Sequence, residues 1–212
     1  ALNALTTFSR SITTDFGEFR AINGGTLITP NLTTLSNHVA VRVSGATSSI
    51  GLGNVTSANT VSFYALDGGV VPLNSLTSYI ADSSGSTFQA DGTGSKLDLS
   101  PLTTFNGGTF NNSKLIANNG GIIELENVTS LNTGAFMIDA TNSATINLSA
   151  LTTFTRTNFA DTARLLAAGG GSILTSSLTT LGPVLVEIDG ATSSINMSNL
   201  TSVDSTSFTA TN

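Results

Sequence analysis

One short phrase recurs nine times along the 212 residues: Leu or Val, then Thr, then Thr or Ser, then an apolar residue. Repeats of roughly 20 to 50 residues are typical of solenoids and propellers, because each repeat buries its apolar edge only by stacking on its neighbours. Successive phrases here lie 27, 23, 21, 26, 26, 23, 27 and 22 residues apart. Their central threonines are Thr6, Thr33, Thr56, Thr77, Thr103, Thr129, Thr152, Thr179 and Thr201. The repeat therefore predicts one stacked domain over residues 1–212.

Two further strand-like segments precede the phrases. In the nearer segment, the positions five and three residues before the Leu or Val are mostly apolar and alternate with polar residues, as in Leu97-Asp98-Leu99. The farther segment alternates in the same way, as in Phe63-Tyr64-Ala65 and Phe88-Gln89-Ala90. Alternation with a period of two indicates a strand with one buried face. Glycine pairs between the two segments, such as Gly120-Gly121, predict tight corners.

These segments predict an all-β chain, namely a right-handed, three-sided parallel β-helix (a β-solenoid) of about nine coils of 21–27 residues. The right-handed form follows from the crossover rule for parallel strands. Because the sequence starts in the third strand of a coil and stops after a first strand, we expect a segment of a longer array or a rod that associates end to end. Four insertions follow the phrase and predict loops at one corner: Ser9–Glu18, Ile80–Thr87, Asn106–Ser113 and Thr155–Ala163.

Composition excludes several classes of function. Seven Lys and Arg residues and a net charge of −6 cannot supply the positive patch that nucleic-acid binding requires. No apolar run is long enough for membrane insertion as a helix. The absence of cysteine excludes disulfides and thiolate metal sites, and no cofactor is expected. The Thr-, Ser-, Asn- and Gly-rich, Lys-poor composition favours an extracellular or cell-surface location.

The Leu-Thr-Thr/Ser phrase within coils of alternating strands and glycine corners resembles the Ser/Thr-rich parallel β-helix repeats of large bacterial exported and surface proteins, such as autotransporter passengers and filamentous adhesins. This resemblance covers essentially the whole chain and implies a secreted, structural or adhesive protein. More distantly, the chain resembles pectate-lyase-type helices, which carry catalytic acids and bases on one face. No motif specific to either group is present, so no catalytic or metal-binding residue is carried over.

The nine central threonines are the candidate binding residues. They flank the inward Leu or Val and are expected to point outward from the third strand, with a second outward rank on the other flank that is mostly Asn or Ser, as at Asn31, Asn54 and Ser75. None of the nine phrases contains a charged residue. The predicted flat threonine face resembles the Thr-x-Thr faces of β-solenoid antifreeze proteins, which implies binding to ice or to another regular polymer such as cellulose or chitin. The alternative is that threonine serves only as a strand-favouring ladder residue.

The second Thr or Ser of each phrase is expected to point inward as a corner hydroxyl that satisfies backbone groups. Those residues are Thr7, Thr34, Ser57, Ser78, Thr104, Ser130, Thr153, Thr180 and Ser202.

Three other groups of residues are candidate sites. Asp98, Glu124 and Glu126, with Lys96 nearby, are expected on the outer side of the second strand, either as a calcium-binding cluster or as a solvated acidic patch. His38, the only histidine, has no partner for a catalytic triad or zinc site that the sequence reveals. The two longest late loops are expected to supply contacts or to extend the core, through Phe110, Arg156, Phe159, Asp161 and Arg164.

The sequence thus favours a non-catalytic structural or adhesive segment of a surface protein. Ice binding through the threonine face is the first alternative. A polysaccharide-binding or lyase-like β-helix is the second.

Overall fold

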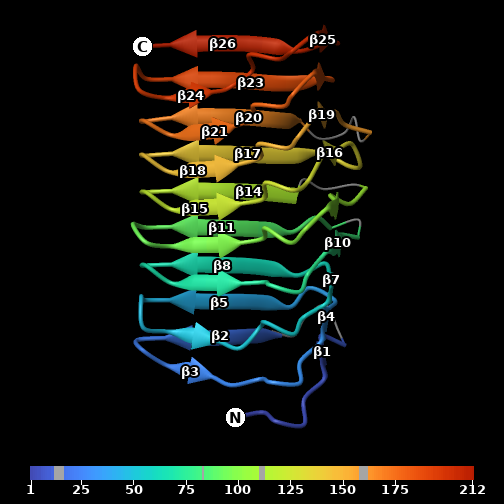
Figure 1. Ribbon diagram of the computed structural model, residues 1–212, viewed down its shortest axis with the longest axis vertical. Coiled ribbons are helices and arrows are strands. Elements are labelled where there is room, and N and C mark those ends of the chain that lie inside the picture. Colours follow the sequence, from blue (N-terminus) through green and yellow to red (C-terminus); the bar gives the residue numbers. More distant parts are fainter. Residues whose placement is uncertain (12–16, 83, 110–112, 158–161) are drawn as a thin grey trace.

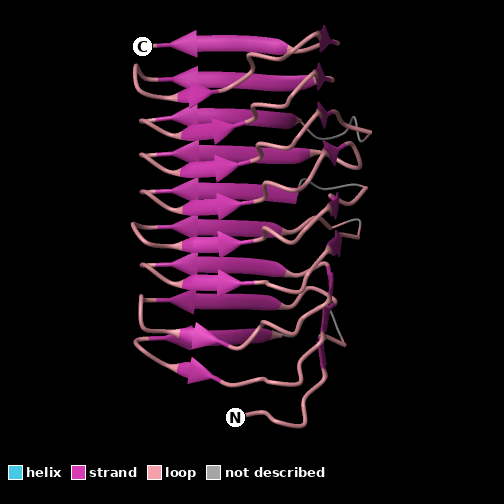
Figure 2. Cartoon of the chain, in the orientation of Figure 1, coloured by secondary structure: helices cyan, strands magenta, loops and turns pink. Residues whose placement is uncertain are grey.

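The computed structural model describes residues 1–11, 17–82, 84–109, 113–157 and 162–212. Within these ranges the chain forms strands, turns and loops, without a helix (Figure 2). Short parallel strands stack into an elongated parallel β-solenoid of about eight turns. In Figure 1 the nearer strands run to the right and the farther ones to the left while the chain climbs, so the coil is right-handed as predicted.

Each full coil contributes one strand to each of three sheets. The first sheet has nine strands in the described part, all joined in parallel to their neighbours one coil away. Its members have five or six residues, with alternating buried and outward positions except in the last strand, which is exposed throughout. They are β2 (Glu18–Ile22), β5 (Ala40–Ser44), β8 (Ser62–Leu66), β11 (Thr87–Asp91), β14 (Ser113–Asn118), β17 (Phe136–Thr141), β20 (Ala163–Ala168), β23 (Val184–Asp189) and β26 (Ser207–Thr211).

The second and third sheets consist of two- and three-residue strands. The second comprises β3 (Thr26–Leu27), β6 (Ser49–Ile50), β9 (Val70–Pro72), β12 (Lys96–Asp98), β15 (Ile122–Glu124), β18 (Thr145–Asn147), β21 (Ser172–Leu174) and β24 (Ser194–Ile195). The third comprises β1 (Thr7–Ser9), β4 (Thr34–Ser36), β7 (Ser57–Asn59), β10 (Ser78–Ile80), β13 (Thr104–Asn106), β16 (Ser130–Leu131), β19 (Thr153–Phe154), β22 (Thr180–Leu181) and β25 (Ser202–Val203). Hydrogen-bonded pairing is interrupted between β6 and β9 and between β13 and β16.

Like residues stack on like through the core. In the first sheet Phe63 pairs with Phe88, and Phe88 pairs with Leu115, while alanines form the next ladder along the strands. In the second sheet Leu97, Ile123 and Ile146 stack in the same way. All these side chains are fully buried. The predicted register is therefore confirmed.

A group of aromatic rings fills the middle of the core. Tyr79, Phe88 and Phe105 contact one another with ring centroids 4.9–5.0 Å apart, and Phe136 continues the stack from Phe105 at 5.1 Å. The Tyr79 hydroxyl accepts from Val61 N (2.9 Å) and lies 2.6 Å from Ser86 Oγ, so this buried polar atom is satisfied. Burial raises the pKa of Tyr79 well above its ordinary value.

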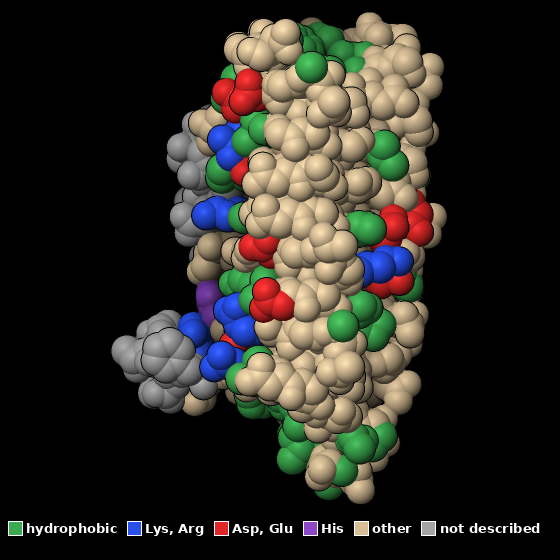
Figure 3. Space-filling model, turned by 90° about the vertical axis from the view of Figure 1, so that its left-hand side faces the viewer, with side chains coloured by type: hydrophobic (Ala, Val, Ile, Leu, Met, Phe, Trp, Pro, Cys, Tyr) green, Lys and Arg blue, Asp and Glu red, His purple; other side chains and the backbone are tan. Residues whose placement is uncertain are grey.

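The corner between the first two sheets depends on close contact between adjacent coils. A Cβ on Gly121 or Gly171 would overlap a backbone carbonyl of the coil below, at Ala90 or Ala140 respectively. Three corner serines share one hydrogen-bond pattern. Ser95, for example, donates to Asp91 O within its own turn (2.5 Å) and accepts from Gly68 N of the coil below (2.9 Å). Ser48 and Ser193 do the same. Figure 3 views this corner, where an uncharged strip runs along the rod, with charged side chains at several heights on its left and one charged cluster on its right.

The third strand differs from the prediction. It begins one residue after the central threonine, so the phrase Leu or Val and the threonine lie in the corner that precedes the strand. Leu32 and Leu35, three residues apart, are both fully buried, which a straight strand with a period of two cannot achieve. The chain bends between them instead, at Thr33 and Thr34.

Candidate functional site

The nine central threonines form a ladder along this corner, which we call the threonine ladder. Eight of their side chains are exposed and Thr179 is half-buried, so the outward orientation is confirmed. Their vertical alignment is confirmed by main-chain bonds between successive members, such as Thr33 N to Thr6 O (2.9 Å) and Thr152 N to Thr129 O (2.9 Å). The ladder lies on a bend rather than on the flat face of a strand, which corrects the predicted geometry.

The hydroxyls of the threonine ladder take part in stacking the coils. Thr152 Oγ1 donates to Thr129 O of the coil below at 2.9 Å, and Thr179 Oγ1 donates to Thr152 O at 3.1 Å. Each of these carbonyls also accepts two main-chain N–H groups from the upper coil. Thr33, Thr103 and Thr201 repeat the hydroxyl bond. Five of the nine ladder hydroxyls thus donate their hydrogen within the protein.

The residues that directly precede the Leu or Val of each phrase also form hydrogen bonds within the protein. Asn54 Nδ2 donates to Pro30 O (2.7 Å), Asn127 Nδ2 to Ser100 O (2.7 Å) and Asn199 Nδ2 to Ser176 O (2.6 Å). Asn31 and Ser75 form equivalent bonds to the coil below. These amides and hydroxyls satisfy turn carbonyls that no strand ladder reaches, which explains why Asn and Ser recur at this position.

The second Thr or Ser of the phrase was predicted to point inward. All nine residues are exposed or half-buried, so that prediction was wrong, although the Ser130 hydroxyl oxygen is buried without a hydrogen-bond partner. Because the bend turns both hydroxyl residues outward, the next residue occupies the core, as Leu35, Tyr79 and Phe154 do.

The acidic residues lie on the outer side of the second sheet, as expected for two of them. Asp98 pairs in register with Glu124, while Glu126 lies in the turn after β15 rather than on a strand. Lys96 Nζ lies 3.3 Å from Asp98 Oδ2 and 4.0 Å from Glu124 Oε1. Burial pushes the pKa of Asp98 upward, but hydrogen bonds from Ser100 and the charge of Lys96 outweigh it and lower that pKa. Among the described residues, no group of three His, Asp or Glu side chains is placed to hold a metal ion.

Five late-loop residues were candidates. Phe110, Phe159 and Asp161 lie outside the described residues, and Arg156 lies half-buried in the loop after β19. Arg164 was expected in a loop but lies in β20, where it donates to Asp139 from Nε (3.0 Å) and Nη2 (2.5 Å) and approaches Glu187 at 3.9 Å. Hydrogen bonding to Asp139 raises the pKa of Arg164. This arginine therefore joins three neighbouring coils of the first sheet.

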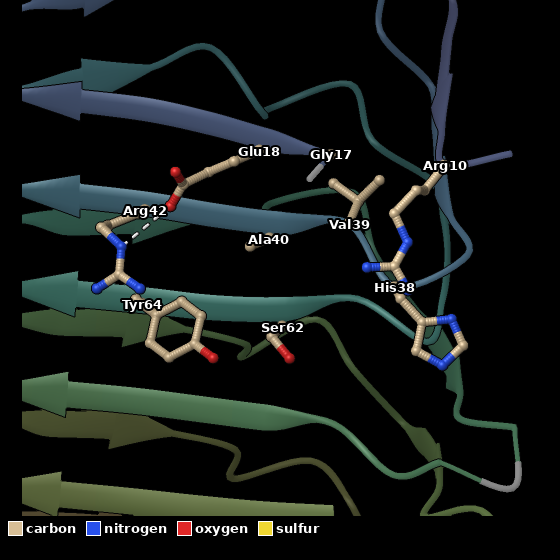
Figure 4. Close-up of a pocket in the computed structure, with 9 residues that line it drawn as sticks. All are labelled: Arg10, Gly17, Glu18, His38, Val39, Ala40, Arg42, Ser62 and Tyr64. Carbon is tan, nitrogen blue, oxygen red and sulfur yellow. Dashed lines mark hydrogen bonds and ion pairs between the residues drawn. The ribbon is translucent and has the colours of Figure 1, made fainter. Parts of the chain in front are cut away.

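A groove on the outer face of the first sheet was not predicted. It encloses about 390 Å³ and is lined by residues of the first three strands of that sheet and of the corners before them. Figure 4 shows Arg42, Tyr64 and Glu18 on one side and Arg10 and His38 on the other. His38 also has a carboxylate partner that the sequence did not reveal, since its Nε2 lies 3.6 Å from Asp82 Oδ2.

Comparison of the chain with protein-family models, with curated proteins and with solved structures gives no match. Within the described ranges, the structure contains no helical segment that could span a membrane.

Proposed function

We propose that this Ser/Thr-rich β-solenoid is a non-catalytic, structural or adhesive segment of an extracellular surface protein, in which the stacked coils act as a stiff spacer. The proposal rests on one observation, namely the hydrogen bonds that polar side chains of one coil make to the coil below. Thr side chains of the phrase, and Asn and Ser side chains just before it, bond to carbonyls of the coil below, in addition to the main-chain pairing that runs unbroken through the first sheet. Such cross-coil bonds tie each coil to its neighbour, which is what a rod that holds its shape requires.

The surface location can be tested on intact source cells. An antibody against the purified chain is expected to label them without permeabilisation, and labelling that appears only after permeabilisation would contradict the proposal.

The absence of catalysis is tested by incubating the chain with a panel of plant, algal and bacterial polysaccharides at several pH values. No new reducing ends or unsaturated products are expected above those of a heat-denatured sample.

Ice binding remains a second candidate, because the threonine ladder is largely exposed and free of charged residues. Its position on a bend and its internally donated hydroxyls weigh against it. Thermal hysteresis and ice-recrystallisation inhibition are expected to be absent. If either activity is found, Thr103→Tyr and Thr129→Tyr are expected to abolish it without unfolding the chain, and retention of activity in both variants would place the ice site elsewhere.

A valine scan tests the structural use of the threonine hydroxyls. Thr152→Val removes the 2.9 Å bond to Thr129 O while keeping the β-branched shape, so the free energy of unfolding is expected to fall by about 0.5–1.5 kcal/mol. Thr129→Val is the matched control, because the structure records no bond from the Thr129 hydroxyl to the coil below, and a change under about 0.5 kcal/mol is expected. Equal effects in urea denaturation would show that the hydroxyl bond contributes nothing.

A further inference from the structure

The groove on the first sheet has a floor of small residues between two taller walls. Ala40 and Ser62 pair in register on neighbouring coils and form the floor with Gly17, whose main-chain O accepts from Ala40 N (2.8 Å). Figure 4 shows the Arg42 and Tyr64 side chains on one wall and those of Arg10 and His38 on the other. A volume of about 390 Å³ falls within the range of small-ligand sites.

Positive charge gathers around this groove although the chain as a whole is acidic. Arg10 and Arg42 line it, and Arg20 and Arg42 line an adjoining hollow of about 370 Å³. These are three of the seven Lys and Arg residues in a chain with a net charge of −6. Among the described residues that line the two hollows, Glu18 is the one acidic residue, and Arg42 Nε holds its Oε1 at 3.1 Å. A hollow lined in this way attracts anions.

The hydrogen-bonding groups on the walls and floor are mostly donors. The guanidinium of Arg42 stacks over the ring of Tyr64, with its carbon 4.4 Å from the ring centroid. Its bond to Glu18 uses Nε, so the two terminal nitrogens keep their N–H groups at the edge of the stack. Ser62 Oγ accepts from Thr87 N (3.1 Å), which leaves its hydroxyl hydrogen to be donated. The Tyr64 hydroxyl points toward Ser62 in Figure 4.

The corner that carries His38 is held in an uncommon backbone conformation. Asn37 and His38 both have positive φ, at 60° and 61°, in the left-handed region that is uncommon for residues other than glycine. Main-chain bonds from Asn37 N to Asn59 O (3.1 Å) and from His38 N to Thr60 O (2.7 Å) fix this corner on the next coil. The histidine wall is therefore placed by the backbone, independently of its side-chain contact with Asp82.

We propose that this groove binds a single oxyanionic group, namely a carboxylate, phosphate or sulfate, carried by a small polar ligand. The Arg42 terminal N–H groups and the Tyr64 and Ser62 hydroxyls supply donors to the groove, and Arg10 adds positive charge on the opposite wall. A guanidinium edge matches the paired oxygens of such a group. Stacking on Tyr64 fixes the plane of Arg42 before the ligand arrives, which lowers the entropic cost of binding. This proposal rests on the groove alone and does not depend on the spacer role.

Calorimetric titration of the full chain at low ionic strength tests the proposal. The probes are sodium phosphate, sodium sulfate, glucuronate and uncharged glucose. Saturable binding of at least one anion is expected, with none for glucose. Phosphate or sulfate binding without glucuronate assigns the site to a tetrahedral anion, whereas glucuronate binding alone assigns it to a carboxylate. Binding of glucose as tight as that of the anions, or no saturable binding by any anion, would overturn the proposal.

Two variants and one control place the site. Arg42→Gln is expected to weaken anion binding about tenfold or more, because a charge-assisted donor pair is lost. Ala40→Leu fills the floor without changing charge and is expected to exclude glucuronate. Lys114→Gln removes the same charge from an exposed position on the same sheet, and its Kd is expected to stay within about twofold of that of the unmodified chain. If Arg42→Gln binds as well as Lys114→Gln while both keep their circular dichroism spectra, the groove is not the site.

Discussion

Replacing Gly171 with alanine is expected to lower the free energy of unfolding by about 3 kcal/mol or more. The new Cβ would overlap the carbonyl oxygen and carbon of Ala140 in the coil below. Neither partner can move cheaply, because Gly171 N donates to Ala168 O (3.0 Å) and the next residue, Ser172, bonds through its N to Ala144 O (2.9 Å). The two coils would have to separate at this corner, with loss of cross-coil hydrogen bonds.

Gly53→Ala is the matched control for this experiment. A Cβ at Gly53 would meet no atom within 4 Å, and neither glycine lies in the left-handed region, so the two substitutions differ only in the space around them. The control is expected to change stability by less than about 1 kcal/mol, with a slight gain from the reduced freedom of the unfolded chain. Urea denaturation followed by circular dichroism measures both variants. Equal stability of the two would contradict the close stacking of the corners.

The glycine corners were predictable from the sequence in their positions, but only partly in the reason that requires glycine there. Their positions were predicted from Gly-Gly pairs between strand-like segments, for the reason that glycine tolerates positive φ. That reason holds for Gly170, with φ 83°, but not for Gly171. The requirement at Gly171 comes from a carbonyl about one coil earlier in the chain, and no local pattern reveals which carbonyl the register brings there.

The threonine ladder was predicted in its alignment and exposure but not in its shape. Each phrase places apolar residues at its first and fourth positions, as in Leu32 and Leu35, and a strand cannot bury both on one side. The bulky fourth residues, such as Phe105, were the available signal for a bend. The hydroxyl bonds to the coil below could not be predicted, because a hydrogen bond depends on the positions of neighbouring coils to within a few tenths of an ångström.

The groove could not be predicted from the sequence. Glu18, Arg42 and Tyr64 are outward residues of three coils, and each one alone reads as an ordinary solvated position on a strand. The step from Arg42 to Tyr64 is 22 residues and places one over the other only in the observed register of β5 and β8. Arg10 and His38 come from the corners between the third and first sheets, whose paths depend on loops of unequal length. Repeat analysis locates strands well and says little about the corner loops where the repeat is broken.

Phe88→Ala is expected to cost about 3–5 kcal/mol, the largest effect of a core truncation in this chain. The ring is fully buried and contacts Phe63, Tyr79 and Phe105, with centroids 5.6, 4.9 and 5.0 Å away. Its removal leaves a cavity that stacked main chains on both sides cannot close, since cross-coil bonds fix their spacing.

The same substitution should also show how the rod unfolds. Each coil contacts mainly its neighbours, so the loss is expected to weaken the middle coils first and to make amide hydrogens of β8, β11 and β14 exchange faster than those of β20 and β23. Phe208→Ala is the control, because that ring is 51% exposed, and a cost under about 1 kcal/mol with unchanged exchange in β11 is expected. Uniform acceleration along the whole chain would instead mean that the stack unfolds as a single cooperative unit, and that the coils are coupled over distances beyond nearest neighbours.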